Sequence, residues 1–165
     1  MNANEIYILG VGYNTIVYID LVEACGYKVV GIYHYDNERI GEKIHGYPII
    51  DSNINLFKNK SLIGLNFAIS VGDNSIRTNL AKQIRDKGGN IPTLIHPSAI
   101  VSKFATIENS VVIHANSVVQ ADTVIKQDTV VSYNVSVTHT SKIGNSCYLA
   151  SGSSIGAYVN ICDNV

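Results

Sequence analysis

The chain has 165 residues, of which 46% are hydrophobic, and its 12 basic and 13 acidic side chains leave a net charge of -1. The hydrophobic content excludes a disordered chain, and balanced charge without a Lys/Arg cluster argues against nucleic-acid partners and polybasic membrane patches. The three cysteines form no CxxC pair, the N-terminus lacks a signal-peptide pattern, and no apolar run is long enough for a membrane span. We therefore expect a cytoplasmic protein without membrane insertion.

The first half of the chain alternates short apolar strands with helices. The pattern predicts strands at residues 6–9, 29–33, 67–71 and 91–96, with helices at 15–25 and 75–87. This alternation predicts a small parallel sheet of Rossmann type. Ligands of such sheets bind beyond the carboxyl ends of the strands, so the residues found there are candidate ligand contacts.

Two glycines, Gly10 and Gly12, follow the first predicted strand and allow a phosphate to approach the backbone at a helix N-terminus. The dinucleotide fingerprint GxGxxG is incomplete because its third glycine position holds Thr15, so a plain glycine turn is the alternative. Asp36 and Asn37 end the second strand. Asp36 is a candidate for binding a ribose or a base edge, and its alternative is a surface turn residue.

A second candidate group, Gly72, Asn74 and Arg77, follows the third predicted strand. Arg77 lies one turn into the helix, where a guanidinium can reach a phosphate or the neighbouring domain. Asn74 is equally suited to cap the helix.

From Val101 onward an aliphatic residue occupies every sixth position without exception. The members of this row are Val101, Ile107, Ile113, Val119, Ile125, Val131, Val137, Ile143, Leu149, Ile155 and Ile161. A row of small residues lies two positions earlier. A strict period of six fits neither a helix nor simple alternation, and it is the hexapeptide pattern of a left-handed parallel β-helix.

In such a β-helix one coil has three faces, and each face is formed by one hexapeptide. The aliphatic row lies at the axis and the small row lies at the corners. The hexapeptide period is absent from the first part of the chain. We therefore expect a Rossmann-like α/β domain at 1–95 followed by an all-β left-handed parallel β-helix at 96–165.

Five landmarks occur together along the whole chain, and in this order the sequence resembles one family of sugar acyltransferases. They are GVGYN at 10–14, YDN at 35–37, SVGDNSIR at 70–77, IHPSA at 95–99 and VTHTSKIG at 137–144. The family contains the sialic acid O-acetyltransferases and the bacillosamine-pathway N-acetyltransferases (NeuD/PglD-like). The resemblance implies transfer of an acetyl group from acetyl-CoA to an amino group of a nucleotide-activated sugar, in cell-surface glycan biosynthesis.

The resemblance also implies roles for single residues. His139, in the segment VTHTSKIG, matches the general base that removes a proton from the acceptor. Acetyl-CoA would lie between neighbouring β-helices of a homotrimer, and a backbone N–H around Gly144 would stabilise the oxyanion in that donor site. The nucleotide sugar would be bound by the N-terminal domain, through Gly10, Gly12, Asp36, Asn37, Gly72, Asn74 and Arg77.

Two features depart from the family. Where the family has Asp or Glu directly after the histidine, this chain has Thr140, whose hydroxyl orients an imidazole but stabilises its cation less than a carboxylate does. The chain also stops at Val165, in the middle of a repeat, which we interpret as a C-terminal truncation that affects donor binding. These departures leave two alternatives open, an O-acetyltransferase acting on sialic acid or a similar sugar, and a non-catalytic trimer that binds nucleotide sugars. An NAD-dependent enzyme is disfavoured by Thr15 and by the lack of a substrate domain.

The remaining histidines indicate no metal site. His96 belongs to the segment that joins the two domains, and His114 lies several repeats before His139. The hexapeptide carbonic anhydrases need a third ligand histidine close to the second. We therefore expect no metal in the reaction.

Overall fold

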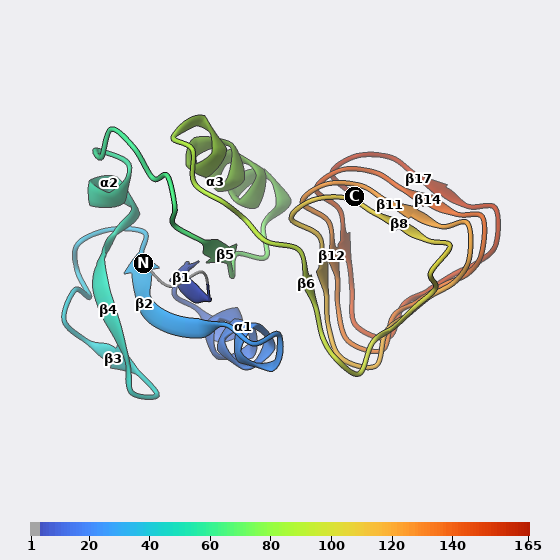
Figure 1. Cartoon of the computed structure of the whole chain (residues 1–165), viewed down its shortest axis with the longest axis horizontal. Coiled ribbons are helices and arrows are strands. Elements are labelled where there is room, and N and C mark those ends of the chain that lie inside the picture. The colour runs from blue at the N-terminus through green and yellow to red at the C-terminus, as the bar shows by residue number, and fades with distance from the viewer. Residues whose placement is uncertain (1–3) are drawn as a thin grey trace. The chain divides into compact units, whose positions relative to one another are not determined.

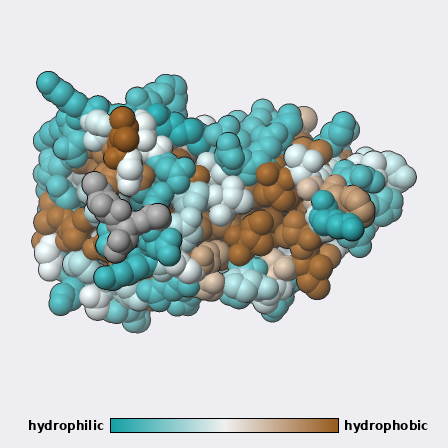
Figure 2. Space-filling model, viewed as in Figure 1, coloured by the Kyte–Doolittle hydropathy of each residue, from teal (hydrophilic) through white to brown (hydrophobic). Residues whose placement is uncertain are grey.

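The computed structural model describes residues 4–165, and its internal contacts divide the chain into two compact units (Figure 1). The N-terminal unit ends at Pro92 and the β-helix unit runs from Thr93 to Val165. Hydrophobic residues are interspersed with hydrophilic ones over the face shown in Figure 2.

The N-terminal unit contains one five-stranded sheet in the order β3-β4-β2-β1-β5. β1, β2, β4 and β5 are parallel, and β3 is antiparallel to β4. The strands are β1 (Glu5–Leu9), β2 (Lys28–His34), β3 (Lys43–Ile44), β4 (Tyr47–Ser52) and β5 (Phe67–Ile69). The helices are α1 (Tyr13–Ala24), α2 (Asn53–Leu56) and α3 (Asn74–Asp86).

Burial explains why these segments form the sheet and its covering helices. β1 lies between β2 and β5, and its Ile6, Ile8 and Leu9 are completely buried. The buried residues of α3 recur at three- and four-residue spacing, which gives the helix one core-facing stripe. That stripe consists of Arg77, Leu80, Ala81 and Ile84. The predicted Rossmann-type sheet is therefore confirmed for its first three strands and for both helices.

The strand predicted at 91–96 forms at Leu94–Ile95, but its predicted place in the Rossmann-like sheet is wrong. Leu94–Ile95, labelled β6, pairs in parallel with Val112–Ile113 of the β-helix unit instead of joining the Rossmann-like sheet. The fourth parallel strand of that sheet is Tyr47–Ser52. A short apolar strand can complete either sheet, and here its partner is the equivalent segment of the next coil.

The β-helix unit consists of two-residue strands stacked in three parallel sheets. One sheet contains β6, β9 (Val112–Ile113), β12 (Val130–Val131) and β15 (Tyr148–Leu149). The second contains β7 (Ile100–Val101), β10 (Val118–Val119), β13 (Ser136–Val137) and β16 (Ser154–Ile155). The third contains β8 (Thr106–Ile107), β11 (Val124–Ile125), β14 (Lys142–Ile143) and β17 (Asn160–Ile161). Each strand pairs with the strand on the same face of the next coil, so the predicted left-handed parallel β-helix is confirmed.

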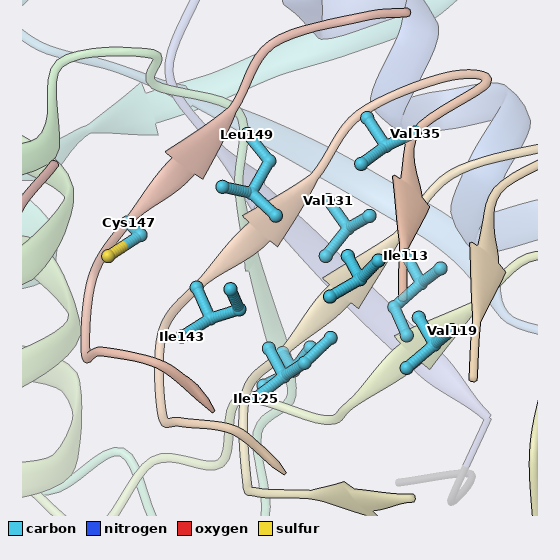
Figure 3. Packing of buried hydrophobic residues seen from close by; sticks show 10 residues of the cluster. Ile113, Val119, Ile125, Val131, Val135, Ile143, Cys147 and Leu149 are labelled. Atoms are coloured by element: carbon cyan, nitrogen blue, oxygen red, sulfur yellow. The ribbon is translucent and has the colours of Figure 1, made fainter. Parts of the chain in front are cut away.

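The aliphatic row fills the interior of the β-helix, as predicted. Figure 3 shows side chains of this row, among them Ile113, Val131 and Ile143, pointing into the space that the coils enclose. The row is completely buried or nearly so from Ile113 to Leu149.

The row of small residues forms a second internal feature, a series of hydrogen bonds that runs from coil to coil. The Ser117 hydroxyl donates to the Ser132 carbonyl oxygen at 2.6 Å and accepts from the Val135 amide at 3.2 Å. Thr129 makes the same pair of bonds two faces further along, to Gly144 and Cys147. Buried hydroxyls are thus satisfied by backbone groups of the following coil.

Each corner of the β-helix from Ser110 onward contains one residue in the left-handed backbone conformation. The nine that are not glycine have φ between 55° and 62°. This row consists of Ser110, Asn116, Asp122, Asp128, Asn134, Thr140, Ser146, Gly152, Tyr158 and Asn164. The chain therefore changes direction at each of these corners with a single left-handed residue.

Candidate functional site

A pocket of about 610 Å³ in the N-terminal unit lies at the carboxyl ends of its parallel strands. Gly10 follows β1, Tyr35 follows β2, Asn53 follows β4, and Val71 lies just beyond β5. The other residues lining the pocket are Val11, Ile54, Phe57, Ile76, Leu80 and Gln83. This is the position at which open parallel sheets bind their ligands.

The turn after β1 requires its first glycine but uses its second differently from a dinucleotide fingerprint. Gly10 has φ +110°, and a Cβ atom there would lie 2.9 Å from both Ser70 Oγ and Val71 Cγ2. Gly12 is extended, and its N–H donates to Thr15 Oγ1 at 2.8 Å. The Thr15 hydroxyl donates in turn to the Gly10 carbonyl oxygen. Thr15 therefore closes the turn from within, at the position where the fingerprint has glycine.

Asp36 and Asn37 lie beside the pocket in a polar network at the ends of β2 and β4. Asp36 Oδ1 lies 2.8 Å from His34 Nδ1 and accepts from the Glu38 amide at 2.9 Å. These contacts, that of Glu38 foremost, hold the pKa of Asp36 below its usual range. Asn37 Oδ1 accepts hydrogen bonds from Ser52 Oγ and from Asn55 Nδ2. Neither predicted residue lines the pocket itself, but both belong to the network beside Tyr35 and Asn53, which do line it.

The group after β5 is also brought together, but Arg77 faces inward. Arg77 is buried, and its guanidinium donates to the Gly72 carbonyl oxygen at 3.0 Å and to Asn74 Oδ1 at 2.8 Å. The helix cap is not Asn74, because Asp73 accepts the Ile76 amide at 2.9 Å. The geometry gives Arg77 the role of holding the loop between β5 and α3.

Sequence reasoning missed Tyr35 and Asn53, which line the pocket. Asn53 Oδ1 is a buried acceptor with no hydrogen-bond partner among the described residues. Asp36 raises the pKa of the exposed Tyr35. Tyr35 stands inside the landmark YDN, whereas Asn53 follows β4, a strand for which no expectation was made.

His139 lies in the β-helix unit on the wall of a second pocket of about 550 Å³. The other residues lining this pocket are Ile100, Ser102, Val118, Val119, Gln120, Ala121 and Asp122. The pocket is an open groove that runs along β7 and β10 to the corner at 120–122, which follows β10. An imidazole on its wall is accessible to a substrate.

Three groups contact His139. Its Nδ1 lies 3.2 Å from Thr140 Oγ1, and its backbone N–H donates to Gln120 Oε1 at 3.2 Å. The ring of Tyr158 meets the imidazole edge to face, with centroids 5.5 Å apart and an interplanar angle of 88°. When Nδ1 carries the proton, the Nδ1–H group donates a hydrogen bond to Thr140 Oγ1, and Nε2 is left as a basic nitrogen.

Gly144 is explained by close packing between coils. A Cβ atom at this position would lie within 2.6 Å of the Asp163 amide nitrogen and of the Cys162 carbonyl carbon. Its N–H donates to the Ile161 carbonyl oxygen at 2.9 Å. An oxyanion would have to compete with that bond, so the assignment of Gly144 to the donor site stays a prediction.

The other histidines of the β-helix unit lie elsewhere. His114 is buried against Tyr133, with ring centroids 4.6 Å apart, and burial together with nearby His96 lowers the pKa of His114 to about 4. Residues 4–165 contain no cluster of three or more His, Cys, Asp or Glu side chains that would hold a metal ion. Among the same residues, no helix combines the length and apolar character that a membrane span requires.

Comparison with known proteins identifies relatives of this chain. The PglD N-terminal domain family matches residues 5–84. The UDP-N-acetylbacillosamine N-acetyltransferase of Bacillus subtilis (strain 168) is 51% identical over 49 residues, which are 30% of this chain and 23% of that protein. The matched segment thus spans about a quarter of that relative.

Two solved structures share the architecture. PerB from Caulobacter crescentus, solved in complex with CoA and GDP-perosamine, is 28% identical with a TM-score of 0.80, over 91% of this chain and 70% of that one. The acetyltransferase domain of PglB from Neisseria gonorrhoeae FA1090 is 26% identical with a TM-score of 0.81, over 97% and 86%. Residues 5–84 thus match the PglD N-terminal domain family, and the chain shares its succession of a Rossmann-like sheet and a parallel β-helix with these two structures.

Proposed function

We propose that this protein transfers an acetyl group from acetyl-CoA to an amino group of a nucleotide-activated sugar in cell-surface glycan biosynthesis. The observation that carries the proposal is His139, an accessible imidazole on a groove of the β-helix, in a chain that also has a PglD N-terminal domain. The complex of the related PerB with CoA and GDP-perosamine supports the same pair of ligand classes. The reaction would take place in the cytoplasm.

His139 acts as the general base. Thr140 Oγ1 accepts a hydrogen bond from Nδ1–H, and Nε2 takes a proton from the sugar amine as the amine nitrogen attacks the thioester carbonyl carbon. The C–S bond then breaks, and the leaving CoA thiolate takes the proton that the His139 imidazolium holds, which restores the neutral imidazole. The products are the N-acetylated sugar nucleotide and CoA. No metal takes part in these steps.

The nucleotide sugar occupies the pocket of the N-terminal unit. Gly10 lines the pocket at the end of β1, and Gly12 precedes the first residue of helix α1 beside it. Asp36 and Asn37 hold the segments beside Tyr35 and Asn53, and Arg77 holds the loop that contains the pocket residue Val71. Arg77 binds Gly72 in that loop and Asn74 at the first position of α3, and Tyr35 and Asn53 contribute the wall of the pocket.

The donor site involves the β-helix unit and a second copy of the chain. A homotrimer would place acetyl-CoA between neighbouring β-helices, near the coil that contains Gly144. The exposed apolar residues Ile100 and Phe104, 67% and 65% accessible, are suited to such an interface. Light scattering on the purified protein tests the trimer.

The function is tested by mass spectrometry of nucleotide 4-amino sugars after incubation with acetyl-CoA. Wild type forms a product heavier by one acetyl group, and His139→Ala does not. His45→Asn is the matched control, because His45 lies in the N-terminal unit with φ 46° and Asn accepts that conformation. The control retains the activity of wild type.

Two other outcomes would replace the proposal. Acetylation of hydroxyl acceptors alone, such as sialic acid, would establish an O-acetyltransferase. Calorimetric binding of nucleotide sugars without binding of acetyl-CoA would establish a non-catalytic protein, and His139→Ala would then leave that binding unchanged.

A further inference from the structure

The row of left-handed corner residues contains two members that do not suit this conformation. Eight of its ten positions hold Ser, Asn, Asp or Gly. The exceptions are Thr140, which is β-branched and has φ 62°, and Tyr158, which is bulky and has φ 60°. For such residues a positive φ is a strained outlier, and strain of this kind is concentrated at functional sites.

Both exceptions lie on one corner, beside His139. Thr140 and Tyr158 occupy equivalent positions of consecutive coils, so Tyr158 lies directly after Thr140 along the β-helix. The Tyr158 amide donates to the His139 carbonyl oxygen at 3.4 Å, and its ring meets the imidazole edge to face. The same corner one coil earlier has Asp122, a residue type that accepts a positive φ.

Burial does not explain why a tyrosine occupies this left-handed position. Tyr158 is 73% exposed, so little hydrophobic surface offsets its strained backbone. What its ring does contact is the imidazole, at a centroid separation of 5.5 Å. Edge-to-face packing at this separation is a favourable aromatic geometry and restricts rotation of the smaller ring.

His139 is thereby held from three directions. Gln120, from the preceding coil, binds its backbone N–H, and Thr140 binds Nδ1. Tyr158, from the following coil, packs against the imidazole ring. An exposed imidazole without these contacts would sample several rotamers and both tautomers, whereas a general base must present one nitrogen in one place.

We propose that Tyr158 is a positioning residue for His139, which together with Thr140 keeps the imidazole in one orientation with Nε2 toward the groove. The proposal rests on the proposed function for its effect on rate, but the orientation of the ring is a property of the free protein. Tyr158 acts through His139 and need not touch either substrate.

The test compares Tyr158→Asn, which removes the ring and suits the left-handed backbone, with Tyr158→Phe, which keeps the ring. Tyr158→Asn is expected to melt no lower than wild type, yet its kcat falls about tenfold, part of the roughly 10²–10⁴ that a positioned base contributes. The KM values for both substrates stay within about twofold, because uniform binding is not affected. Tyr158→Phe retains the wild-type kcat. Asn134→Gly, at another corner with φ 55°, is the control and retains it as well.

A second measurement does not depend on turnover. The ¹⁵N shifts of the His139 imidazole report the ratio of its tautomers, which is expected to move toward an even mixture in Tyr158→Asn but not in Tyr158→Phe. A wild-type kcat in Tyr158→Asn, or an unchanged tautomer ratio, would overturn the proposal. If wild type acetylates none of the nucleotide sugars, the proposed function fails, and the tautomer ratio still decides the role of Tyr158.

Discussion

His114 makes the β-helix unit sensitive to acid. Burial and nearby His96 lower the pKa of His114 from 6.5 to about 4, so the folded protein resists protonation that the unfolded chain accepts. Stability from this group is complete above pH 6.5 and is lost as the pH falls toward 4. At pH 4 the free energy of unfolding is therefore about 3 kcal/mol lower than above pH 6.5, since each pKa unit corresponds to about 1.4 kcal/mol. The change His114→Phe keeps an aromatic ring beside Tyr133 and removes the titration.

The assay is urea unfolding of wild type and His114→Phe at pH 7, 6, 5 and 4. Between pH 7 and pH 4 the free energy of unfolding is expected to fall by about 3 kcal/mol more in the wild type than in the variant, with the loss beginning below pH 6.5. Acid losses from carboxylates with lowered pKa, such as Asp36 and Asp163, occur in both proteins and cancel in the comparison. Equal pH dependence of the two proteins would refute the reasoning, whatever the variant does to stability at pH 7.

Three further predictions concern the backbone and the corners. Thr140→Asp relieves the left-handed backbone and should raise stability by about 1 kcal/mol and kcat about tenfold, and a lower melting temperature would contradict this. Ser117→Ala removes both hydrogen bonds of a buried hydroxyl and should cost about 1–3 kcal/mol in urea unfolding. The exposed Ser154→Ala is its control and should change stability by less than about 0.5 kcal/mol. Gly10→Ala should lower the melting temperature because of its φ and its neighbours at 2.9 Å, whereas Gly12→Ala has open space and should not.

The β-helix was predictable because the residue pattern that specifies it lies within each hexapeptide. An aliphatic residue at every sixth position and a small one two positions earlier specify axis and corner without reference to distant parts of the chain. His139 was predictable as an accessible side chain for the same reason, since it lies two residues after the axis residue Val137.

The N-terminal unit was less predictable because its contacts connect distant segments. β4 has no strict alternation and gains its place by pairing with β2, and it brings Asn53 to the pocket. The inward orientation of Arg77 depends on a carbonyl group of the preceding loop. Because every residue has a carbonyl group, no sequence pattern predicts this contact. Likewise, the amide of Gly144 is occupied because the next coil stacks on it.

The pairing of each strand with its equivalent one coil away restricts how such a domain can change its length. The buried hydroxyls obey the same rule, because they too reach backbone groups of the following coil. Loss or gain of a whole coil therefore preserves every pairing. An insertion of a single hexapeptide would keep the aliphatic row intact but carry each later strand to the next face, and His139 would leave its groove. The fold therefore tolerates a change in length of one hexapeptide. The position of His139 is kept only when the length changes by a whole coil of three hexapeptides.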